Sequence, residues 1–180
     1  MNKIFRISTT LILLISGQLL YAGNAFTLAE LAASTEKPLE SSVTGKWGYD
    51  GNCLVFMDKS GKTPSEEEVD KLMLAMGASY DNLVFTLNPD HKGSLRLGDR
   101  SVDFDWTLDS DSRVLNTKVA LFKLNGYIYA DGNRLIMVYS RSDLFMMMRY
   151  LCSAEGKKNI KPLGQLLDCC EGLTVGMEFK

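Results

Sequence analysis

The chain has 180 residues, of which 46% are hydrophobic and 23% are charged, and its formal net charge is −2 at pH 7. This length suits one domain built around a single core. The mild acidity, together with aromatic residues that are not interleaved with basic clusters, argues against a protein that binds nucleic acid.

Residues 1–25 have the three parts of a secretory signal peptide. Lys3 and Arg6 give a positive start, an apolar run extends from Leu11 to Leu20, and Gly23-Asn24-Ala25 places small residues where a signal peptidase reads. The apolar run is too short to span a membrane, and no later stretch approaches the roughly 20 apolar residues that a span needs. The alternative is an N-terminal anchor helix that is left in place. We expect an exported, periplasmic protein with no membrane span in its mature chain.

The mature chain is expected to form one folded domain after a short lead-in. Removal of residues 1–25 takes away Lys3 and Arg6 and no acidic residue, so the formal net charge falls from −2 to −4. Residues 26–42 have the composition of a helical or irregular lead-in, and residues 43–180 form the domain itself.

Four cysteines in an exported chain allow three ways of forming two disulfides. A bond from Cys152 to Cys169 or Cys170 would close a loop of about 17 residues and contribute about 3 kcal/mol in the chain-entropy model. Buried free thiols are the alternative, because a free cysteine behaves as a small hydrophobic residue. No Cys-x-x-Cys or histidine-rich spacing occurs, so we expect neither a zinc site nor another metal site.

A strand is expected from Gly45 to Met57, and a helix is expected to follow it. Ser65 and Glu68 form a capping box in which each side chain accepts from the backbone N–H of the other residue. Apolar residues then recur at helical spacing, and Gly77 ends the helix.

The next sixty residues alternate with period two, which is typical of half-buried strands. Turn sequences separate them at 88–90, 98–99, 109–112 and 131–133, and Asn125-Gly126 is a favoured hairpin turn, although Gly126 could instead begin the following strand. The expected strands are Leu83–Leu87, Leu95–Leu97, Val102–Leu108, Leu115–Leu124, Tyr127–Ala130 and Leu135–Tyr139.

A second helix with a broad apolar face is expected around Leu144–Leu151, with Ser142 as its N-cap, and residues 160–170 could hold another short helix. Leu173–Phe179 reads as a final strand that pairs with the first and removes the open edges of the sheet. The fold class is therefore all-β with two or three short helices, an antiparallel up-and-down barrel of about eight strands.

Several short motifs occur in a fixed order along the chain. They are Gly45-x-Trp47-x-Tyr49 followed by Cys53 and Phe56, then Phe85-Thr86-Leu87-Asn88-Pro89-Asp90, Leu124-Asn125-Gly126-Tyr127 and Glu171-Gly172-Leu173-Thr174-Val175-Gly176-Met177. In this order they resemble a family of lipocalin-like domains of unknown function from exported Bacteroidota proteins. The resemblance covers nearly all of the mature chain, from about Val43 onward, and it implies a lipocalin-like fold and an envelope location, with no catalytic residues. In lipocalins the tryptophan of the Gly-x-Trp pair closes the floor of the barrel, so we expect Gly45, Trp47 and Tyr49 to be structural.

Large inward-facing side chains are the candidates for a ligand pocket. Such pockets are mostly apolar and contain a few polar groups that orient the ligand. Side chains of this size could equally fill a small barrel. The candidates are Phe85, Leu87, Leu97, Phe104, Trp106, Tyr127, Tyr129, Met137 and Tyr139, with Leu95 and Leu121 beside them.

Other features are expected to be structural. The soft apolar surface at Met146, Met147 and Met148 could bind a partner, but a helix that caps the barrel is the simpler interpretation. His91 lies in a turn without an orienting partner, and Asp109 and Asp111 fall short of the six to eight oxygen ligands that calcium takes. We expect a non-catalytic binder of a small apolar or amphipathic ligand, without a cofactor; the alternative is a protein-interaction module of the cell envelope with a filled barrel.

Overall fold

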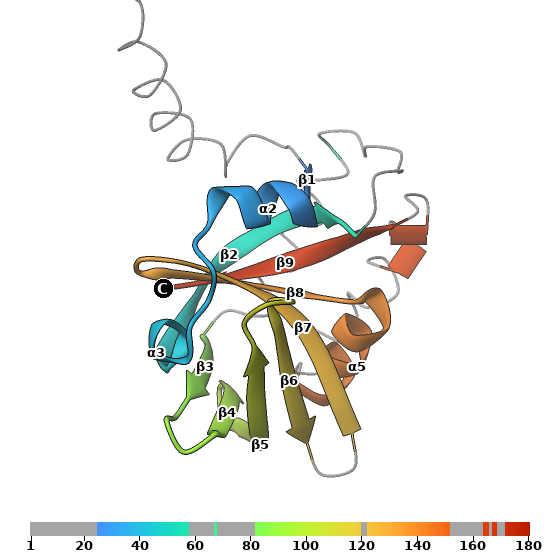
Figure 1. Ribbon diagram of the computed structural model, residues 1–180. Helices are drawn as coiled ribbons and strands as arrows, with labels where there is room; N and C mark the ends of the chain where they lie inside the picture. Colours follow the sequence, from blue (N-terminus) through green and yellow to red (C-terminus); the bar gives the residue numbers. More distant parts are fainter. Residues whose placement is uncertain are drawn as a thin grey trace, which may run out of the picture.

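The computed structural model describes residues 25–57, 67, 82–119, 122–151, 164–165, 167–168 and 172–180. Within them lies a sheet of nine strands, of which β2 to β9 close into a barrel (Figure 1). The barrel strands are β2 (Gly45–Phe56), β3 (Leu83–Leu87), β4 (Lys92–Leu97), β5 (Arg100–Asp109), β6 (Val114–Val119), β7 (Phe122–Asp131), β8 (Arg134–Tyr139) and β9 (Leu173–Phe179).

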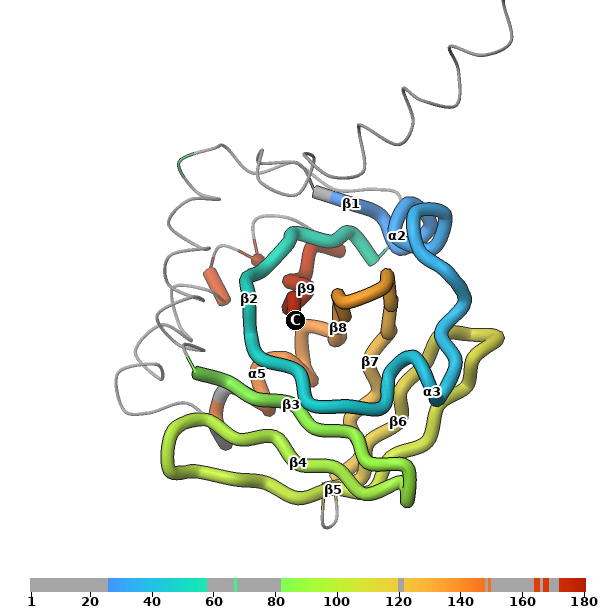
Figure 2. Tube along the Cα trace, turned by 90° about the vertical axis from the view of Figure 1, so that its left-hand side faces the viewer, coloured from blue at the N-terminus to red at the C-terminus, as the bar shows by residue number. Residues whose placement is uncertain are grey.

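Each barrel strand pairs antiparallel with its neighbour in the sequence, and the first strand pairs with the last. The closing contact runs along most of β2, from Tyr49 opposite Phe179 to Phe56 opposite Leu173. Figure 2 shows the resulting ring of strands end on. The predicted all-β, up-and-down barrel is therefore confirmed.

Alternation decides which side chains face the core. In β5, Phe104 and Trp106 are buried while Asp103 and Asp105 are exposed, as the sequence predicts. In β2 the alternation changes phase, because a bulge at Asp50 shifts the register against β9. Residues before the bulge point inward at odd positions, and residues after it point inward at even positions such as Leu54.

The expected turn at Asn125-Gly126 is wrong. These residues lie within β7, where Asn125 pairs with Asn116 and Gly126 pairs with Leu115. The hairpin instead comes at the rung where Val119 faces Phe122, so β6 ends earlier and β7 begins earlier than the sequence indicates. The turns expected at 88–90, 98–99, 109–112 and 131–133 are present, at residues 89–90, 98–99, 110–113 and 132–133.

The lead-in packs on the outside of the barrel. β1 (Ala25–Thr27) pairs in parallel with the end of β2, and two short helices follow, α2 (Leu28–Ser34) and α3 (Glu40–Val43). Helix α2 packs on a second cluster of apolar side chains, here called the outer cluster, which lies on the outer face of the barrel. Its buried members are Leu31, Cys53, Val55, Tyr129, Ile136 and Val138.

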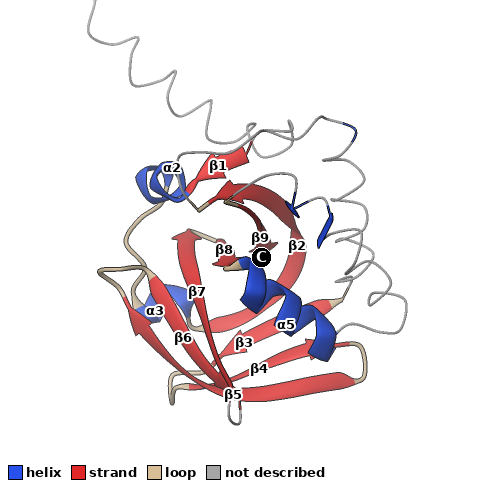
Figure 3. Cartoon of the chain, turned by 90° about the vertical axis from the view of Figure 1, so that its right-hand side faces the viewer, coloured by secondary structure: helices blue, strands red, loops and turns tan. Residues whose placement is uncertain are grey.

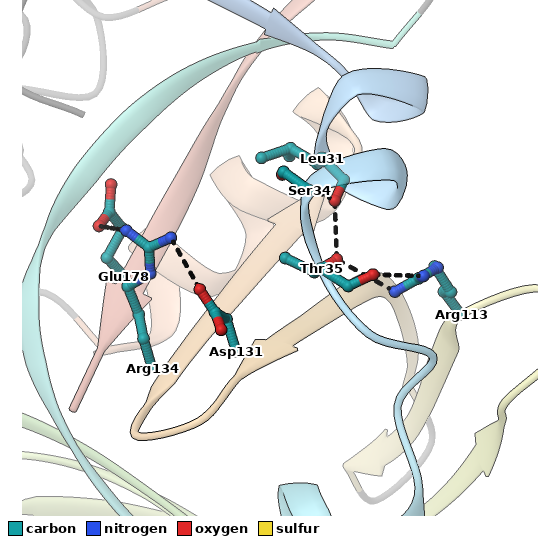
Figure 4. A network of polar contacts seen from close by, with 7 residues as sticks. All are labelled: Leu31, Ser34, Thr35, Arg113, Asp131, Arg134 and Glu178. Carbon is teal, nitrogen blue, oxygen red and sulfur yellow. Dashed lines mark hydrogen bonds and ion pairs between the residues drawn. The ribbon is translucent and has the colours of Figure 1, made fainter. Parts of the chain in front are cut away.

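Arg113 fastens this lead-in to the barrel (Figure 4). Its guanidinium donates to the carbonyl oxygen of Ala32 in the last turn of α2 at 3.2 Å, and to those of Thr35 and Glu36 just beyond it at 3.1 and 2.7 Å. It also donates to the Thr35 hydroxyl at 3.2 Å. A cation at this end of a helix meets carbonyls that have no partner within the helix and the negative end of its dipole. The same guanidinium lies 5.5 Å from the ring centre of Tyr129.

The helix after β8 is α5 (Arg141–Leu151), which lies across one opening of the barrel (Figure 3). Its N-cap is Ser140 and not the expected Ser142, because the Ser140 hydroxyl accepts from the backbone N–H of Asp143 at 3.2 Å. The helix expected from Ser65 lies outside the described residues apart from Glu67, which is helical. In the expected 160–170 segment, 164–165 and 167–168 are helical. Among the described helices, none is both long and apolar enough to cross a membrane.

Candidate functional site

A small apolar cavity lies between α5 and the barrel wall. Its volume is about 40 Å³. Strands β3 to β8 supply most of its walls and α5 supplies its cover. The lining residues are Phe85, Leu95, Val102, Phe104, Thr117, Val119, Phe122, Leu124, Tyr139, Met146 and Met147.

The cavity extends to the last rung of the β6–β7 ladder. Val119 and Phe122 face each other on this rung, and both line the cavity. Phe122 is also 44% exposed to solvent. We therefore infer that the mouth of the cavity lies beside Phe122.

Among the described residues, no charged group lines the cavity, and two polar side chains, Thr117 and Tyr139, contribute to its lining. The Thr117 hydroxyl donates to the carbonyl oxygen of Leu124 at 3.0 Å, so its proton is already used. Burial raises the pKa of Tyr139 well above its ordinary value, so its phenol stays neutral. A molecule in this space would meet hydrocarbon on almost every side.

Aromatic rings fill the interior next to the cavity. The Phe85 ring stacks on Phe104 at 5.5 Å between centroids and lies 5.9 Å from Phe179, which meets Tyr49 edge-on at 6.3 Å. Such pairs contribute beyond their buried area. The barrel is thus packed along this row, and the cavity occupies the space left under α5.

The predicted pocket residues separate into three groups. Phe85, Phe104 and Tyr139 line the cavity. Leu87, Trp106 and Met137 are buried in the same core without lining it, and Leu97 packs against that core half-buried. Leu95, named beside the candidates, lines the cavity, whereas Leu121 lies outside the described residues.

Tyr127 and Tyr129 do not face the interior, so their placement in the pocket is corrected. They alternate with the inward-facing Ile128 and Ala130 of β7 and belong to the outer cluster under α2. The Tyr129 hydroxyl donates to the carbonyl oxygen of Leu28 at 3.4 Å. Burial raises the pKa of Tyr129 to about 12.

Several lining residues escaped the sequence analysis because the hairpin was placed too late. With the turn before Phe122, alternation brings Val119, Phe122 and Leu124 inward together. The same alternation, in β5 and β6, brings Val102 and Thr117 inward. Met146 and Met147 were expected to cap the barrel, and they do so as the roof of the cavity.

The expected structural residues occupy the barrel wall. Trp47 is buried, and its indole N–H donates to the carbonyl oxygen of Val43 at 2.8 Å, which links β2 to α3. Tyr49 packs half-buried against the core, and Gly45 begins β2. Cys53 is a buried free thiol, whereas Cys152, Cys169 and Cys170 lie outside the described residues.

The remaining candidates are surface features. The His91 ring lies 5.1 Å from that of Trp106, in a turn with φ of 60°. Asp109 accepts from the backbone N–H groups of Asp111 and Ser112, and the bonds from Ser112 lower the pKa of Asp109. Asp111 pairs with Lys37. The described part of the chain holds no group of three or more residues that could bind a metal ion.

A polar hollow lies on the outer face of the same strands. It covers β5, β6 and β7, so the cavity and the hollow lie on opposite faces of the β6–β7 hairpin. Its outward-pointing residues are Asp105, Thr107, Asn116, Lys118, Lys123 and Asn125.

A match to a protein-family model agrees with this architecture. Residues 20–180 match a family model described as Lipocalin-like domain (DUF4923). The crystal structure of a DUF4847 family protein from Bacteroides vulgatus ATCC 8482 is similar over 78% of this chain and 94% of that chain, with 10% sequence identity and a TM-score of 0.41. A search of the curated proteins finds no match.

Proposed function

The chain belongs to the lipocalin-like domain family DUF4923, and on that premise we propose that it is a non-catalytic binder of a small apolar or amphipathic ligand. The cavity under α5 carries this proposal. The described residues that line it are hydrocarbon apart from two hydroxyl-bearing side chains, Thr117, which donates to a backbone carbonyl, and Tyr139, and Phe122 at its edge is partly exposed to solvent. Binding sites for small molecules have this composition.

The size of the cavity limits how a ligand enters. A water molecule needs about 10–15 Å³ in the same measure, so about 40 Å³ admits only a few water-sized groups. A longer ligand must therefore move part of the roof. Met146 and Met147 suit that role, because methionine side chains are unbranched and adapt to irregular shapes.

We place this function in the periplasm as part of the same proposal. The support comes from residues 1–25, with their basic start, apolar run and small residues at Gly23 and Ala25. The proposal needs no cofactor and no nucleic acid.

Native mass spectrometry of protein purified from its own periplasm, followed by solvent extraction, tests the proposal. We expect a small molecule that co-purifies at close to one per chain. The matched variants are Leu124→Phe, which fills the cavity, and Leu97→Phe, which enlarges a core side chain that does not line it. Loss of the molecule in the first variant alone supports the site, and a ligand-free wild-type protein with no uptake of added alkyl probes overturns it.

A protein-interaction module is the second candidate, because aromatic rings fill the interior beside the cavity and Phe122 presents apolar surface. In that case chemical cross-linking in the periplasm should capture a defined partner, and Phe122→Ser should abolish its capture without changing the thermal unfolding temperature.

A further inference from the structure

We propose that the ligand is an anionic amphiphile whose alkyl chain occupies the cavity and whose head group is held by Lys118 and Lys123 at the mouth. This inference rests on the proposed function and specifies the ligand class. The residues that the structure describes around the cavity include no charged side chain, so burial of a charged head group inside it would be costly and an alkyl chain is the part that fits.

The register of the β6–β7 hairpin places two lysines next to the mouth of the cavity. Val119 and Phe122 form the inward-facing rung at the mouth, and the neighbouring rung is Lys118 opposite Lys123. Both lysines point outward into the polar hollow. Side chains directly opposite each other in an antiparallel pair have Cβ atoms about 5 Å apart, and like charges there destabilise the sheet. An anion between the two ammonium groups would remove that repulsion.

The acids near the lysine pair lie on the side of Lys118. Asp105 is opposite Lys118 on β5; the Lys92 ammonium binds its carboxylate at 2.5 Å and, with a smaller share from Lys118, lowers its pKa. Asp103 borders the same hollow as Asp105 and Lys118. Within the part of the chain that the structure describes, neither Lys118 nor Lys123 forms an ion pair.

A lysine side chain is long enough to reach from the outer face of the β6–β7 hairpin toward the mouth of the cavity on its inner face. The aliphatic stem of a lysine can lie along apolar surface while its ammonium group reaches outward. Lys123 follows Phe122 directly and Lys118 precedes Val119, so both stems start one residue from the mouth. An alkyl chain that leaves the cavity past Phe122 would bring its head group within reach of both ammonium groups.

Isothermal titration of the mature protein with octanoate, octan-1-ol and octylammonium separates the head group from the chain. We expect octanoate to bind about tenfold more tightly than octan-1-ol at low salt, and octylammonium to bind most weakly. The octanoate preference should shrink at high ionic strength, because these charges are exposed. In Lys118→Gln/Lys123→Gln, octanoate should fall to the affinity of octan-1-ol, whose own affinity should not change.

Lys46→Gln is the matched control, because Lys46 is an exposed lysine at the start of β2. Its binding of all three probes should equal that of the wild type. Equal binding of octanoate and octan-1-ol by the wild-type protein would overturn the anionic head group and leave the proposed function intact. Failure of all three probes to bind would overturn the proposed function as well.

Discussion

The ring of Phe104 lies over Gly93, its partner across the β4–β5 ladder, so closely that a β-carbon at position 93 would come within 2.3 Å of a ring atom. Tyr139 lies over Gly126 in the same way, with a ring atom 2.9 Å from the position of such a carbon. Both aromatic residues line the cavity. Glycine therefore sets the position of two cavity walls.

Gly93→Ala should destabilise the protein by about 1–3 kcal/mol, the usual cost of forcing an extra group into a packed core. The Thr86 carbonyl oxygen also lies only 2.7 Å from the added carbon, so movement of the Phe104 ring alone cannot relieve the clash. Urea denaturation measures the change. Gly51→Ala is the control, because no atom lies within 4 Å of its added carbon. Equal stability of the two variants would contradict the close packing of Phe104 and Thr86 against Gly93.

Asn52→Leu should stabilise the protein by about 1 kcal/mol. Asn52 faces the interior opposite Met177, and its side-chain oxygen is buried without a hydrogen-bond partner. Its amide nitrogen contacts the Tyr49 hydroxyl. An unsatisfied buried polar atom costs free energy that an apolar side chain of similar volume does not incur. Thermal unfolding tests this, with the exposed Asn125→Leu as a control; a lower unfolding temperature in Asn52→Leu would show that the amide is needed.

The stability of Glu178→Gln, measured as its free energy of unfolding, should increase relative to that of the wild type as the pH rises. Glu178 is 7% exposed on β9, and burial raises the pKa of its carboxyl above the ordinary 4.5, although Arg134 opposes the shift (Figure 4). The folded protein thus holds this proton more tightly than the unfolded chain does. The resulting stability is fully present below pH 4.5 and declines as the pH rises through the folded-state pKa.

Denaturation of wild type and Glu178→Gln from about pH 4 to about pH 8 measures this difference. Gln keeps a neutral side chain throughout. The Arg134 nitrogen lies 3.9 Å from the carboxylate, so the ion pair is loose. A wild-type advantage that grows with pH would show that the Arg134 pair outweighs burial.

Arg113→Gln should release α2 from the barrel. The variant loses bonds to three carbonyl oxygens at the C-terminal end of α2, and each hydrogen bond to a charged group contributes about 1.5–3 kcal/mol. Hydrogen exchange should accelerate in α2 and at the outer cluster before it does so in β5. Arg96→Gln, at an exposed arginine of β4, should leave exchange unchanged. Uniform acceleration throughout the barrel would contradict a local fastening.

The sequence predicts the barrel because its middle strands, β3 to β6, alternate between buried and more exposed residues. In β5, apolar and acidic residues alternate, so the sequence alone shows which face is buried. The buried residues are Phe104 and Trp106, and the exposed ones are Asp103 and Asp105. The final strand is different, since β9 is buried along its whole length. Its outward residues lie under other parts of the chain, and alternation alone does not reveal that covering.

The errors around β7 share one cause. Asn125-Gly126 has the chemistry of a tight turn, but Gly126 is needed to admit the ring of Tyr139. A local rule cannot recognise a glycine that serves a partner on another strand. The outward direction of Tyr127 and Tyr129 is also determined elsewhere, because α2 and Arg113 supply the apolar and cationic surroundings that these rings contact.

The pairing of β2 with β9 has a consequence for the order of folding. Tyr49 and Phe179 are neighbours in the barrel but lie far apart in the sequence, and long-range pairings of this kind form slowly. The barrel cannot close until β9, the last strand in the chain, takes its place between β8 and β2. Until then, β2 and β8 both present unpaired edges, which are templates for pairing with other chains. A folding intermediate that lacks β9 is therefore the form most prone to aggregation.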